Sequence, residues 1–167
     1  MKRSRKISMI GAVCAFGLAA ATSAAIAADD NKLSVAVAFG RGLNTTQPQG
    51  NPLNNVVIPD TIRLKNNGVV HFLVAGFHQI VVYNPGKVDE DVVVPGSGTF
   101  IDDTNGQFYT GILPAGGPPP GIPPTTNPSN AQNRVESVAF TAPGTYLVIC
   151  NVRRHFTDGM FGYVVVK

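Results

Sequence analysis

The chain has 167 residues, 14% of them charged, and a formal net charge of +3 at pH 7. The first 27 residues hold four of the 13 Lys and Arg and none of the 10 Asp and Glu, so the remainder has nine basic and ten acidic residues. A net charge of −1 is not that of a typical nucleic-acid-binding domain, so no nucleic-acid partner is expected. The remaining length, about 140 residues, is enough for one domain with a hydrophobic core.

Residues 1–27 are typical of a secretory signal peptide. Four basic residues lie within the first six positions, an apolar segment covers residues 9 to about 21, and the sequence AIA at 25–27 forms a cleavage site. We expect a periplasmic or otherwise exported protein with a single mature domain at residues 28–167. The alternative is an uncleaved membrane anchor, but the apolar segment is shorter than the roughly 20 residues that a transmembrane helix needs. No membrane span is therefore expected in the mature chain.

Short runs of β-branched and aromatic residues with alternating polarity predict an all-β domain. Turn sequences rich in Asn, Pro and Gly, namely NNG, NPG and APG, separate several of these runs. Seven short strands with this punctuation predict a β-sandwich. The expected strands lie at residues 33–39, 60–65, 69–74, 79–83, 135–140, 145–150 and 161–166.

Residues 111–130, GILPAGGPPPGIPPTTNPSN, interrupt this pattern. Prolines lack the N–H donor that a strand needs, and glycines favour turns, so the segment is predicted to be an insertion loop, partly in polyproline II conformation. It is either a solvated connection or a segment that binds a partner.

The sequence CNVRRHFTDGM near the C-terminus spaces Cys150, His155 and Met160 five residues apart. Cys14 falls within the signal peptide, so Cys150 is the only thiol of the mature chain. An unpaired thiol in an oxidising compartment needs an explanation. A thiolate and a thioether combined with imidazoles suit copper, and two His and one Cys with a weak axial Met form the blue-copper arrangement. The competing interpretation is an unrelated buried Cys, surface His and core Met.

Strand alternation supports the copper interpretation. It places Cys150 on the same, inward face as Tyr146 and Val148, at the end of a strand. Residues 151–161 then form a loop in which Gly159 permits a turn back toward the thiol.

The second imidazole has two candidates, His71 and His78. His71 lies inside the alternating run VVHFLV, whereas His78 lies where one strand ends and the next begins. A residue at a strand end can face a site at the end of a sandwich. We therefore predict that His78 is the ligand and that His71 faces solvent or makes a structural hydrogen bond.

These segments resemble the cupredoxins, the small type 1 (blue) copper proteins. Residues 61–72, TIRLKNNGVVHF, are similar to the strand, turn and strand that precede the first ligand of the family, and 77–81, FHQIV, to the ligand histidine and the residues after it. Residues 140–150, FTAPGTYLVIC, resemble the penultimate strand. The closing Cys-x4-His-x4-Met matches a long form of the ligand loop. The resemblance excludes the Pro/Gly-rich insertion.

The resemblance implies a Greek-key β-sandwich that holds one copper ion and shuttles single electrons between redox partner proteins. The ion would cycle between Cu(I) and Cu(II). Phenylalanines 77, 156 and 161 would tune the potential by excluding water. The ligands it implies are His78, Cys150, His155 and the weak axial Met160.

Enzymatic chemistry is not expected. The residues flanking Cys150 are Ile149 and Asn151 rather than the histidines of a multicopper oxidase, and a binuclear copper centre needs two cysteines. No nucleophile motif for hydrolysis is present. Two alternatives to electron transfer stay open, namely a periplasmic copper carrier or storage protein and an interaction domain whose contact surface is the insertion loop.

Arg153 and Arg154 precede His155, which the resemblance makes the exit for electrons. Two adjacent arginines are not both buried without partners. They either form a docking rim for an acidic patch on a redox partner or brace the loop through a salt bridge to an acidic residue such as Asp158. We expect the protein to be a monomer.

Overall fold

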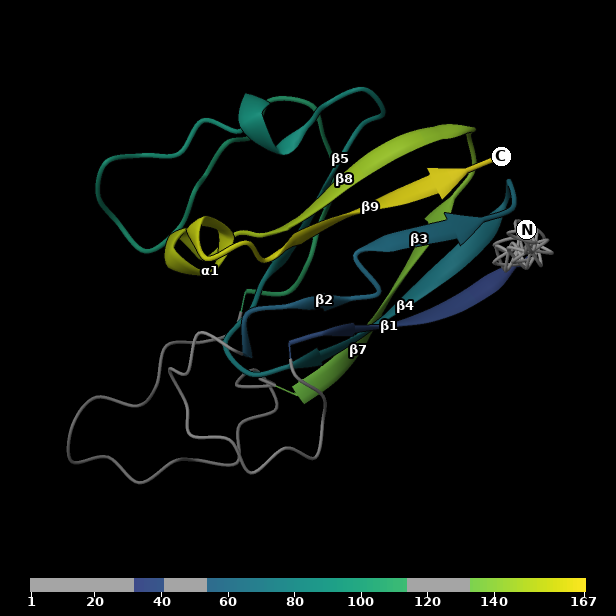
Figure 1. Cartoon of the computed structure of the whole chain (residues 1–167), viewed down its shortest axis with the longest axis horizontal. Coiled ribbons are helices and arrows are strands. Elements are labelled where there is room, and N and C mark those ends of the chain that lie inside the picture. The colour runs from purple at the N-terminus through teal and green to yellow at the C-terminus, as the bar shows by residue number, and fades with distance from the viewer. Residues whose placement is uncertain (1–31, 41–53, 114–132) are drawn as a thin grey trace, which may run out of the picture.

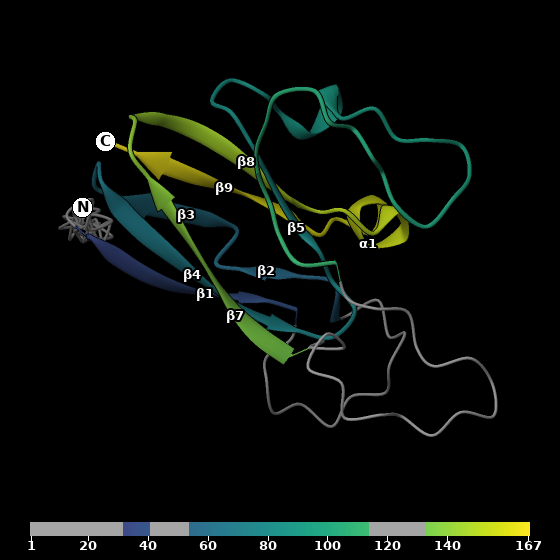
Figure 2. The same ribbon diagram turned by 180° about the vertical axis from the view of Figure 1, so that it is seen from behind.

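The computed structural model describes residues 32–40, 54–113 and 133–167, and within them the chain is almost entirely β (Figures 1 and 2). The expected signal peptide, 1–27, and most of the expected insertion loop, 114–130, lie outside the described residues. The strands are β1 (Ser34–Phe39), β2 (Val57–Ile58), β3 (Thr61–Leu64), β4 (Gly68–Ala75), β5 (Ile80–Tyr83), β6 (Gln107–Thr110), β7 (Asn133–Phe140), β8 (Gly144–Cys150) and β9 (Phe161–Val166). A 3-10 turn, Asp89–Asp91, and one short helix, α1 (Arg153–Thr157), complete the described elements.

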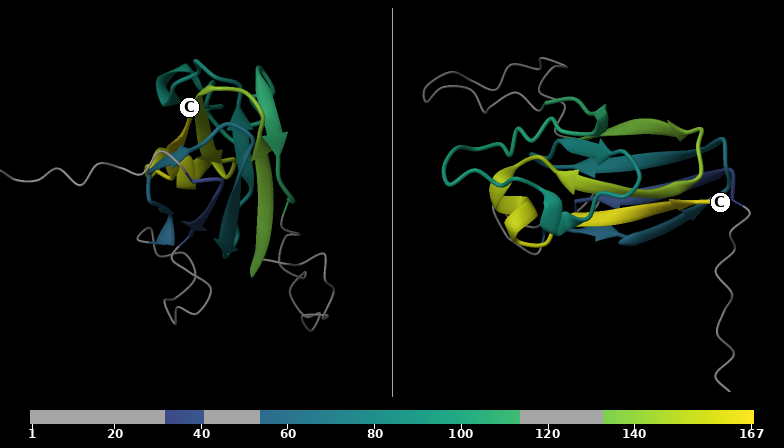
Figure 3. Two further views of the ribbon diagram at one scale, coloured as in Figure 1. Left: turned by 90° about the vertical axis from the view of Figure 1, so that its right-hand side faces the viewer. Right: turned by 90° about the horizontal axis from the view of Figure 1, so that it is seen from above.

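The strands form two sheets that pack face to face as a sandwich (Figure 3). Sheet A has the order β2-β1-β4-β7, and sheet B has the order β3-β9-β8-β5-β6. The pairs β1–β4 and β3–β9 are parallel, and the other pairs are antiparallel. The predicted all-β sandwich is confirmed. Helix α1 lies at one end of the sandwich, and the C-terminus lies at the other.

The main core fills the space between the sheets. The burial of β4 alternates strictly, with Val70, Phe72 and Val74 fully buried and the residues between them half-buried. This is the burial that an alternating strand gives when one of its faces meets a second sheet. On the facing sheet, β8 contributes Val148 and Cys150 to the same cluster.

A second apolar cluster covers the outer face of sheet B. Leu147 and Ile149 of β8 point into it, as alternation predicts, and they pack with Tyr83 of β5. The cluster is covered by Ile101 from the long β5–β6 connection and by Phe156 of α1. Strands β5 and β8 are therefore buried on both faces, which explains their continuous apolar runs IVVY and LVIC.

All seven predicted strands are present, with ends shifted by at most two residues. Strands β2 and β6 were not predicted, because β2 has two residues and the short QFYT run of β6 lacks a clear apolar face. The expected open loop at 151–161 is wrong in part, since it contains α1, whose five residues are too few to show a helical period. No helix in the three described ranges is long and apolar enough to cross a membrane.

Candidate metal centre

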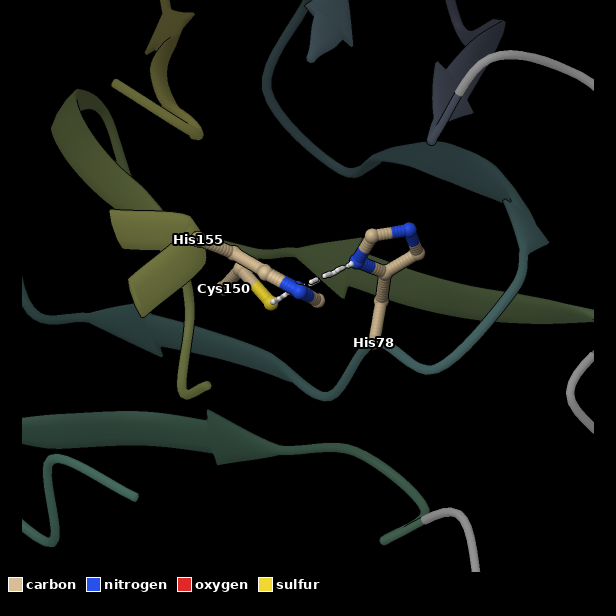
Figure 4. Close-up of side chains that lie close together, drawn as sticks. All are labelled: His78, Cys150 and His155. Carbon is tan, nitrogen blue, oxygen red and sulfur yellow. Dashed lines mark hydrogen bonds between the residues drawn. The ribbon is translucent and has the colours of Figure 1, made fainter. Parts of the chain in front are cut away.

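Three potential metal ligands from distant parts of the chain meet at the α1 end of the sandwich (Figure 4). His78 lies between β4 and β5, Cys150 ends β8, and His155 lies in α1. The two histidine Nδ1 atoms are 3.0 Å apart, and each is 3.7 Å from Cys150 Sγ. Among the described residues, this is the one cluster of His, Cys, Asp or Glu side chains that could hold a metal ion. The structure thus brings together three of the four residues selected as ligands around a common point.

Sheet register fixes the position of Cys150. The residue pairs with Ile80 of β5, and its N–H donates to the Met160 carbonyl oxygen at 3.0 Å. Cys150 is fully buried and shares the main cluster with Tyr146 and Val148. The inward-facing thiol at a strand end agrees with the expectation from alternation.

Met160 lies across from Cys150, where β8 and β9 come together. The adjacent pair, Ile149 and Phe161, belongs to the second cluster on the outer face. Side chains of directly opposed residues share a face and lie close together, and Met160 is fully buried in the main cluster, as Cys150 is. The position suits a thioether donor beside the thiol.

One helical turn returns His155 toward the thiol. The turn ends at Gly159, whose φ of +96° is one that glycine adopts without strain. The Met160 N–H then donates to the His155 carbonyl at 2.9 Å, and β9 begins. The long β5–β6 connection supports this loop, because the Arg153 N–H donates to the Thr99 carbonyl at 2.8 Å. His155 is half-buried, so it is more accessible than His78, which is 3% exposed.

Two glycines form the wall against which the His78 ring packs. A Cβ atom at Gly40 would lie 3.0 Å from His78 Nε2, and one at Gly76 would lie 3.3 Å from it. Both glycines have positive φ, and the Phe39 ring meets the imidazole edge-on at 6.1 Å. With its Nε2 edge against the glycines, the ring turns Nδ1 toward Cys150. Neither glycine was predicted to contact the site, because the only signal in the sequence is their position at strand ends.

The surroundings of the His78 ring fit a metal ligand. A Cβ atom at Gly40 would collide with the Ala75 carbonyl oxygen and lie 3.0 Å from His78 Nε2, so this carbonyl lies on the Nε2 side of the ring, while Nδ1 faces the other two donors. Metal-binding histidines usually donate their second N–H to a carbonyl or carboxylate, which leaves the ligating nitrogen with a free lone pair.

Burial sets the protonation of the three donors. Desolvation, with smaller effects from His155 and Arg134, lowers the pKa of His78 to about 3, and desolvation also lowers the pKa of His155. Burial raises the pKa of the Cys150 thiol to about 12, although backbone N–H groups of Val152 and Gln79 act in the opposite direction. Both imidazoles are therefore neutral near pH 7, and a metal ion that binds the sulfur must displace the thiol proton.

A buried amide pair joins the two chain segments that carry the candidate ligands His78 and Cys150. Gln79 follows His78, Asn151 follows Cys150, and both are 6% exposed. The Asn151 side-chain amide donates to Gln79 Oε1 at 2.8 Å, and the Asn151 N–H donates to the Gln79 carbonyl at the same distance. Gln79 Nε2 donates in turn to the Gly111 carbonyl at 3.0 Å. These bonds fix the spacing between His78 and Cys150.

The donor set fits a soft or borderline transition metal. Ions of this kind bind at about 2.0 Å from imidazole nitrogen and about 2.3 Å from thiolate sulfur, so donors at the corners of a trigonal plane lie about 3.5 to 3.8 Å apart. The observed N–S separations of 3.7 Å agree, and the N–N separation of 3.0 Å is slightly shorter. One thiolate and two imidazoles, with a thioether nearby, are the donors of a blue-copper site.

His71 lies outside this cluster, on the outer face of sheet A. Its Nδ1 is 2.8 Å from Ser137 Oγ, and its Nε2 is 3.1 Å from Ser34 Oγ. The predicted structural hydrogen bond is confirmed.

The expected aromatic shell is only partly in place. Phe77 packs against the main cluster and lies 6.3 Å from the Phe100 ring, which the sequence analysis did not single out. Phe156 and Phe161 instead pack in the second cluster, on the other face of sheet B. Because Phe156 is buried there, it cannot serve as an exposed contact beside His155. The prediction that these two rings surround the site is therefore wrong.

The two arginines of the ligand loop differ in environment. Arg153 is half-buried, and its Nε donates to the Gly98 carbonyl at 2.9 Å, whereas Arg154 is exposed. Asp158 accepts a hydrogen bond from Asn55 Nδ2 at 3.0 Å. Among the described residues no ion pair joins Asp158 to either arginine. Arg153 does stabilise the loop, as one of the two alternatives predicted, but through the Gly98 carbonyl and not through Asp158.

No family model matches the sequence, and no curated protein matches it significantly. Similar solved structures include an auracyanin from Roseiflexus castenholzii, 19% identical with a TM-score of 0.48, aligned over 82% of this chain and 98% of its own. Auracyanin A, described as a "blue" copper protein from Chloroflexus aurantiacus, is 15% identical with a TM-score of 0.43 over 82% and 100%. Pseudoazurin from Methylobacterium extorquens AM1 is 19% identical with a TM-score of 0.40 over 80% and 74%. With identities below 20% and TM-scores below 0.5, these similarities by themselves assign no function.

Proposed function

We propose that this chain is a cupredoxin, an exported type 1 copper protein that carries single electrons between redox partners. The observation that carries the proposal is the convergence of one thiol and two imidazole Nδ1 atoms within 3.0 to 3.7 Å at one end of a β-sandwich. Export is inferred from residues 1–27, and the metal site would explain Cys150, the buried cysteine of the described residues.

Four residues would hold the ion. His78, Cys150 and His155 supply the three strong donors, and Met160 supplies a weak axial thioether. Bound copper would contribute the one-electron couple between Cu(I) and Cu(II). The protein contributes a donor arrangement held by strands and by buried hydrogen bonds, which keeps the ligands in place in both oxidation states.

Electron exchange would take place at His155. This residue is half-buried and lies in α1 at the surface end of the sandwich, while His78 and Cys150 are covered. The main cluster shields the thiol from water, and burial of this kind sets a redox potential. We assign no catalytic turnover to the mature chain, because its one thiol and two of its three histidines would be taken up by the metal site.

Spectroscopy of the copper-loaded mature protein, residues 28–167, tests this function. The oxidised protein should show an intense visible thiolate-to-copper band that disappears in Cys150→Ser, because the band requires the sulfur atom. Reduction should bleach the band reversibly while copper is retained. Retention of the band in Cys150→Ser would overturn the ligand assignment.

The same preparation separates an electron carrier from a copper carrier or storage protein. An electron carrier keeps its copper through repeated oxidation and reduction in the presence of a metal-free copper acceptor. Transfer of copper to the acceptor, with loss of the visible band, would instead favour delivery of the metal.

We further propose that Arg154 takes part in docking of a redox partner with an acidic patch. It is exposed and adjacent to His155, while Arg153 is engaged with Gly98. Rim charges of this type act mainly on the association rate and its dependence on salt. A monomeric carrier would present this end of the sandwich to its partners.

A further inference from the structure

The long β5–β6 connection reaches α1 at the end of the sandwich (Figure 1). Its residues 98–102, which we call the strap, lie beside the first residues of the ligand loop. Phe100 forms an antiparallel β-bridge with Val152. Next to this bridge, the N–H of Arg153, the first residue of α1, donates to the Thr99 carbonyl at 2.8 Å. The strap therefore holds the start of the helix that carries one of the candidate ligands.

Three further hydrogen bonds attach the strap to the loop. The Asn151 carbonyl accepts from the Ile101 N–H at 2.9 Å, and the Asn151 Oδ1 accepts from the Asp102 N–H at 3.3 Å. At the other end of the strap, Arg153 Nε donates to the Gly98 carbonyl at 2.9 Å. The two end residues, Gly98 and Asp102, have positive φ values of +97° and +55°, which are typical of turns. The strap is thus attached to the loop along its whole length.

The strap also contacts the segment that carries the other imidazole. The Phe100 ring lies 6.3 Å from the ring of Phe77, the residue before His78, and both rings pack against the main cluster. His78 and His155 are 77 residues apart in the chain, and their Nδ1 atoms are 3.0 Å apart in space. A segment that touches the neighbourhoods of both can hold them at this separation.

Asp103 fixes the end of the strap. Its side chain is 5% exposed, and its carboxylate accepts a hydrogen bond from Lys87 Nζ at 2.7 Å. The carboxylate also accepts from the N–H groups of Val93 and Asn105, each at 3.1 Å, and the Asp103 carbonyl accepts from the Tyr83 hydroxyl of β5 at 3.0 Å. None of these partners is a candidate ligand. Because a buried carboxylate is costly without its donors, Asp103 cannot move without breaking several bonds together.

We propose that Asp103 is a remote positioning residue of the metal centre, because it anchors the strap that holds the ligand loop and the segment before His78 in place. The inference rests on the proposed function for its effect on copper binding, but the attachment of the strap concerns the chain alone. Release of the strap would let the loop leave its binding-competent position for part of the time. The apparent affinity for the metal would then fall in proportion to the population that stays competent.

Amide hydrogen exchange in the metal-free mature protein tests the anchor. Asp103→Asn keeps the shape of the side chain but removes its charge and one acceptor, which weakens charge-assisted hydrogen bonds. The amides of Ile101 and Arg153, which join the strap to the loop, should exchange at least about tenfold faster than in wild type. The Val148 amide in the centre of β8 should change little. Unchanged exchange at Ile101 and Arg153 would overturn the proposal.

The matched control is Asp89→Asn. Asp89 lies in the same β5–β6 connection, and its Oδ1 accepts a hydrogen bond from the Tyr163 hydroxyl of β9 at 2.5 Å. The variant makes the same chemical change away from the strap, so the two joining amides should exchange as in wild type. Equal acceleration in both variants would contradict the proposal, since it would show a general loosening of the connection. If Asp103→Asn does not fold, Lys87→Met removes the charged donor of Asp103 and should accelerate the same two amides.

Arg153 tests the strap from its other end. Arg153→Met removes the Nε donor, whereas Arg153→Gln places an amide N–H at the same number of bonds from the backbone. The Ile101 amide should exchange about three- to tenfold faster in Arg153→Met and close to the wild-type rate in Arg153→Gln. Arg154→Met removes the exposed charge next to it and should leave this amide unaffected. Equal rates in the two Arg153 variants would show that the bond to Gly98 does not hold the strap.

The copper-loaded variants supply the second readout. Competition with a chelator should give an affinity about three- to tenfold lower for Asp103→Asn than for wild type, and an unchanged affinity for Asp89→Asn. A residue that only stabilises the fold would not change the affinity of the folded protein, so an unchanged affinity in Asp103→Asn would overturn the positioning role. Absence of copper binding by the wild type would defeat the proposed function, but the exchange rates would still decide whether Asp103 anchors the strap.

Discussion

His71 and His78 lie seven residues apart, yet they occupy opposite kinds of environment. His71 is half-buried on the outer face of β4, with its two ring nitrogens bonded to the hydroxyls of Ser34 and Ser137. His78 is 3% exposed, faces the thiol of Cys150, and has glycines along its other edge. The ring nitrogens of His71 are hydrogen-bonded to serine hydroxyls of the neighbouring strands. Nδ1 of His78 instead faces Cys150 and His155, which can also bind a metal.

The difference shows what leaves a histidine available to bind a metal in this fold. On the outer face of a sheet, a side chain in the middle of a strand meets mainly the residues beside it on the neighbouring strands. A side chain beyond the strand end is free to meet other elements, and here β8 and α1 bring donors to it. Desolvation keeps its imidazole neutral, so a lone pair is available for a metal ion.

The largest expected effect follows from this comparison. Replacement of His78 by Ala should weaken copper binding by about 100-fold or more, because loss of a direct ligand exceeds the 10- to 100-fold effects of outer-shell partners. His71→Ala removes the same kind of side chain from a position that is hydrogen-bonded only to serine hydroxyls, and it should change the copper affinity less than about twofold. Competition with a chelator of known affinity measures both. Equal losses in the two variants would reject the assignment of His78.

The stability of the metal-free protein should depend on the same environment. Between pH 6.5 and about 3 the unfolded chain binds a proton at His78 that the folded protein does not. This contribution to stability is therefore fully present above pH 6.5 and is lost as the pH falls. At pH 5 the loss is about 2 kcal/mol, because pH 5 lies 1.5 units below the unfolded pKa of 6.5 and still above the folded pKa. Chemical denaturation at pH 7 and pH 5 measures the loss.

His78→Ala is the control for this pH dependence. The variant lacks the titrating group, so it should lose less stability between pH 7 and pH 5 than the wild type loses. A wild-type protein and a variant with the same loss would show that other groups cause the acid sensitivity.

Met160 should have a smaller effect on binding and a clear effect on potential. Met160→Leu keeps an apolar side chain in the core but removes a donor that favours Cu(II), so copper should stay bound and the potential should rise. Met160→Gln adds an oxygen donor and should lower it. Voltammetry of the two variants measures the shifts, and unchanged potentials in both would remove Met160 from the coordination sphere.

The smallest effect is expected at the surface. Arg154→Gln should slow electron exchange with the redox partner a few-fold at low ionic strength and flatten its salt dependence, since rim charges act on association. Lys65→Gln makes the same charge change at the opposite end of the sandwich, because Lys65 is exposed and follows β3, whose last residue pairs with Val166. Stopped-flow kinetics at several salt concentrations compare the two. Identical responses would show that only net charge matters.

Local patterns were sufficient to predict the strands and to single out three donors that the structure brings together. Alternation in segments such as β4 reports which side chains share a face, and the residue types around Cys150 limit the metal to a thiophilic one. The same reasoning failed for Phe156, because the sequence does not show that the outer face of sheet B is covered as well. When both faces of a strand are buried, its sequence is apolar throughout, and alternation no longer shows which residues face the main core and which face a second cluster.

By itself the sequence determined the all-β class, the position of the strands and the candidate donors His78, Cys150 and His155, since these depend on residue chemistry and on a period of two. Only the tertiary structure decided how the donors converge, how Gly40 and Gly76 turn His78, and how Arg153 reaches the Gly98 carbonyl, 55 residues away in the chain. Such contacts depend on sheet register and on the packing of one sheet against the other. Neither is encoded in any short stretch of sequence, because both arise from the sum of pairings across the whole sandwich.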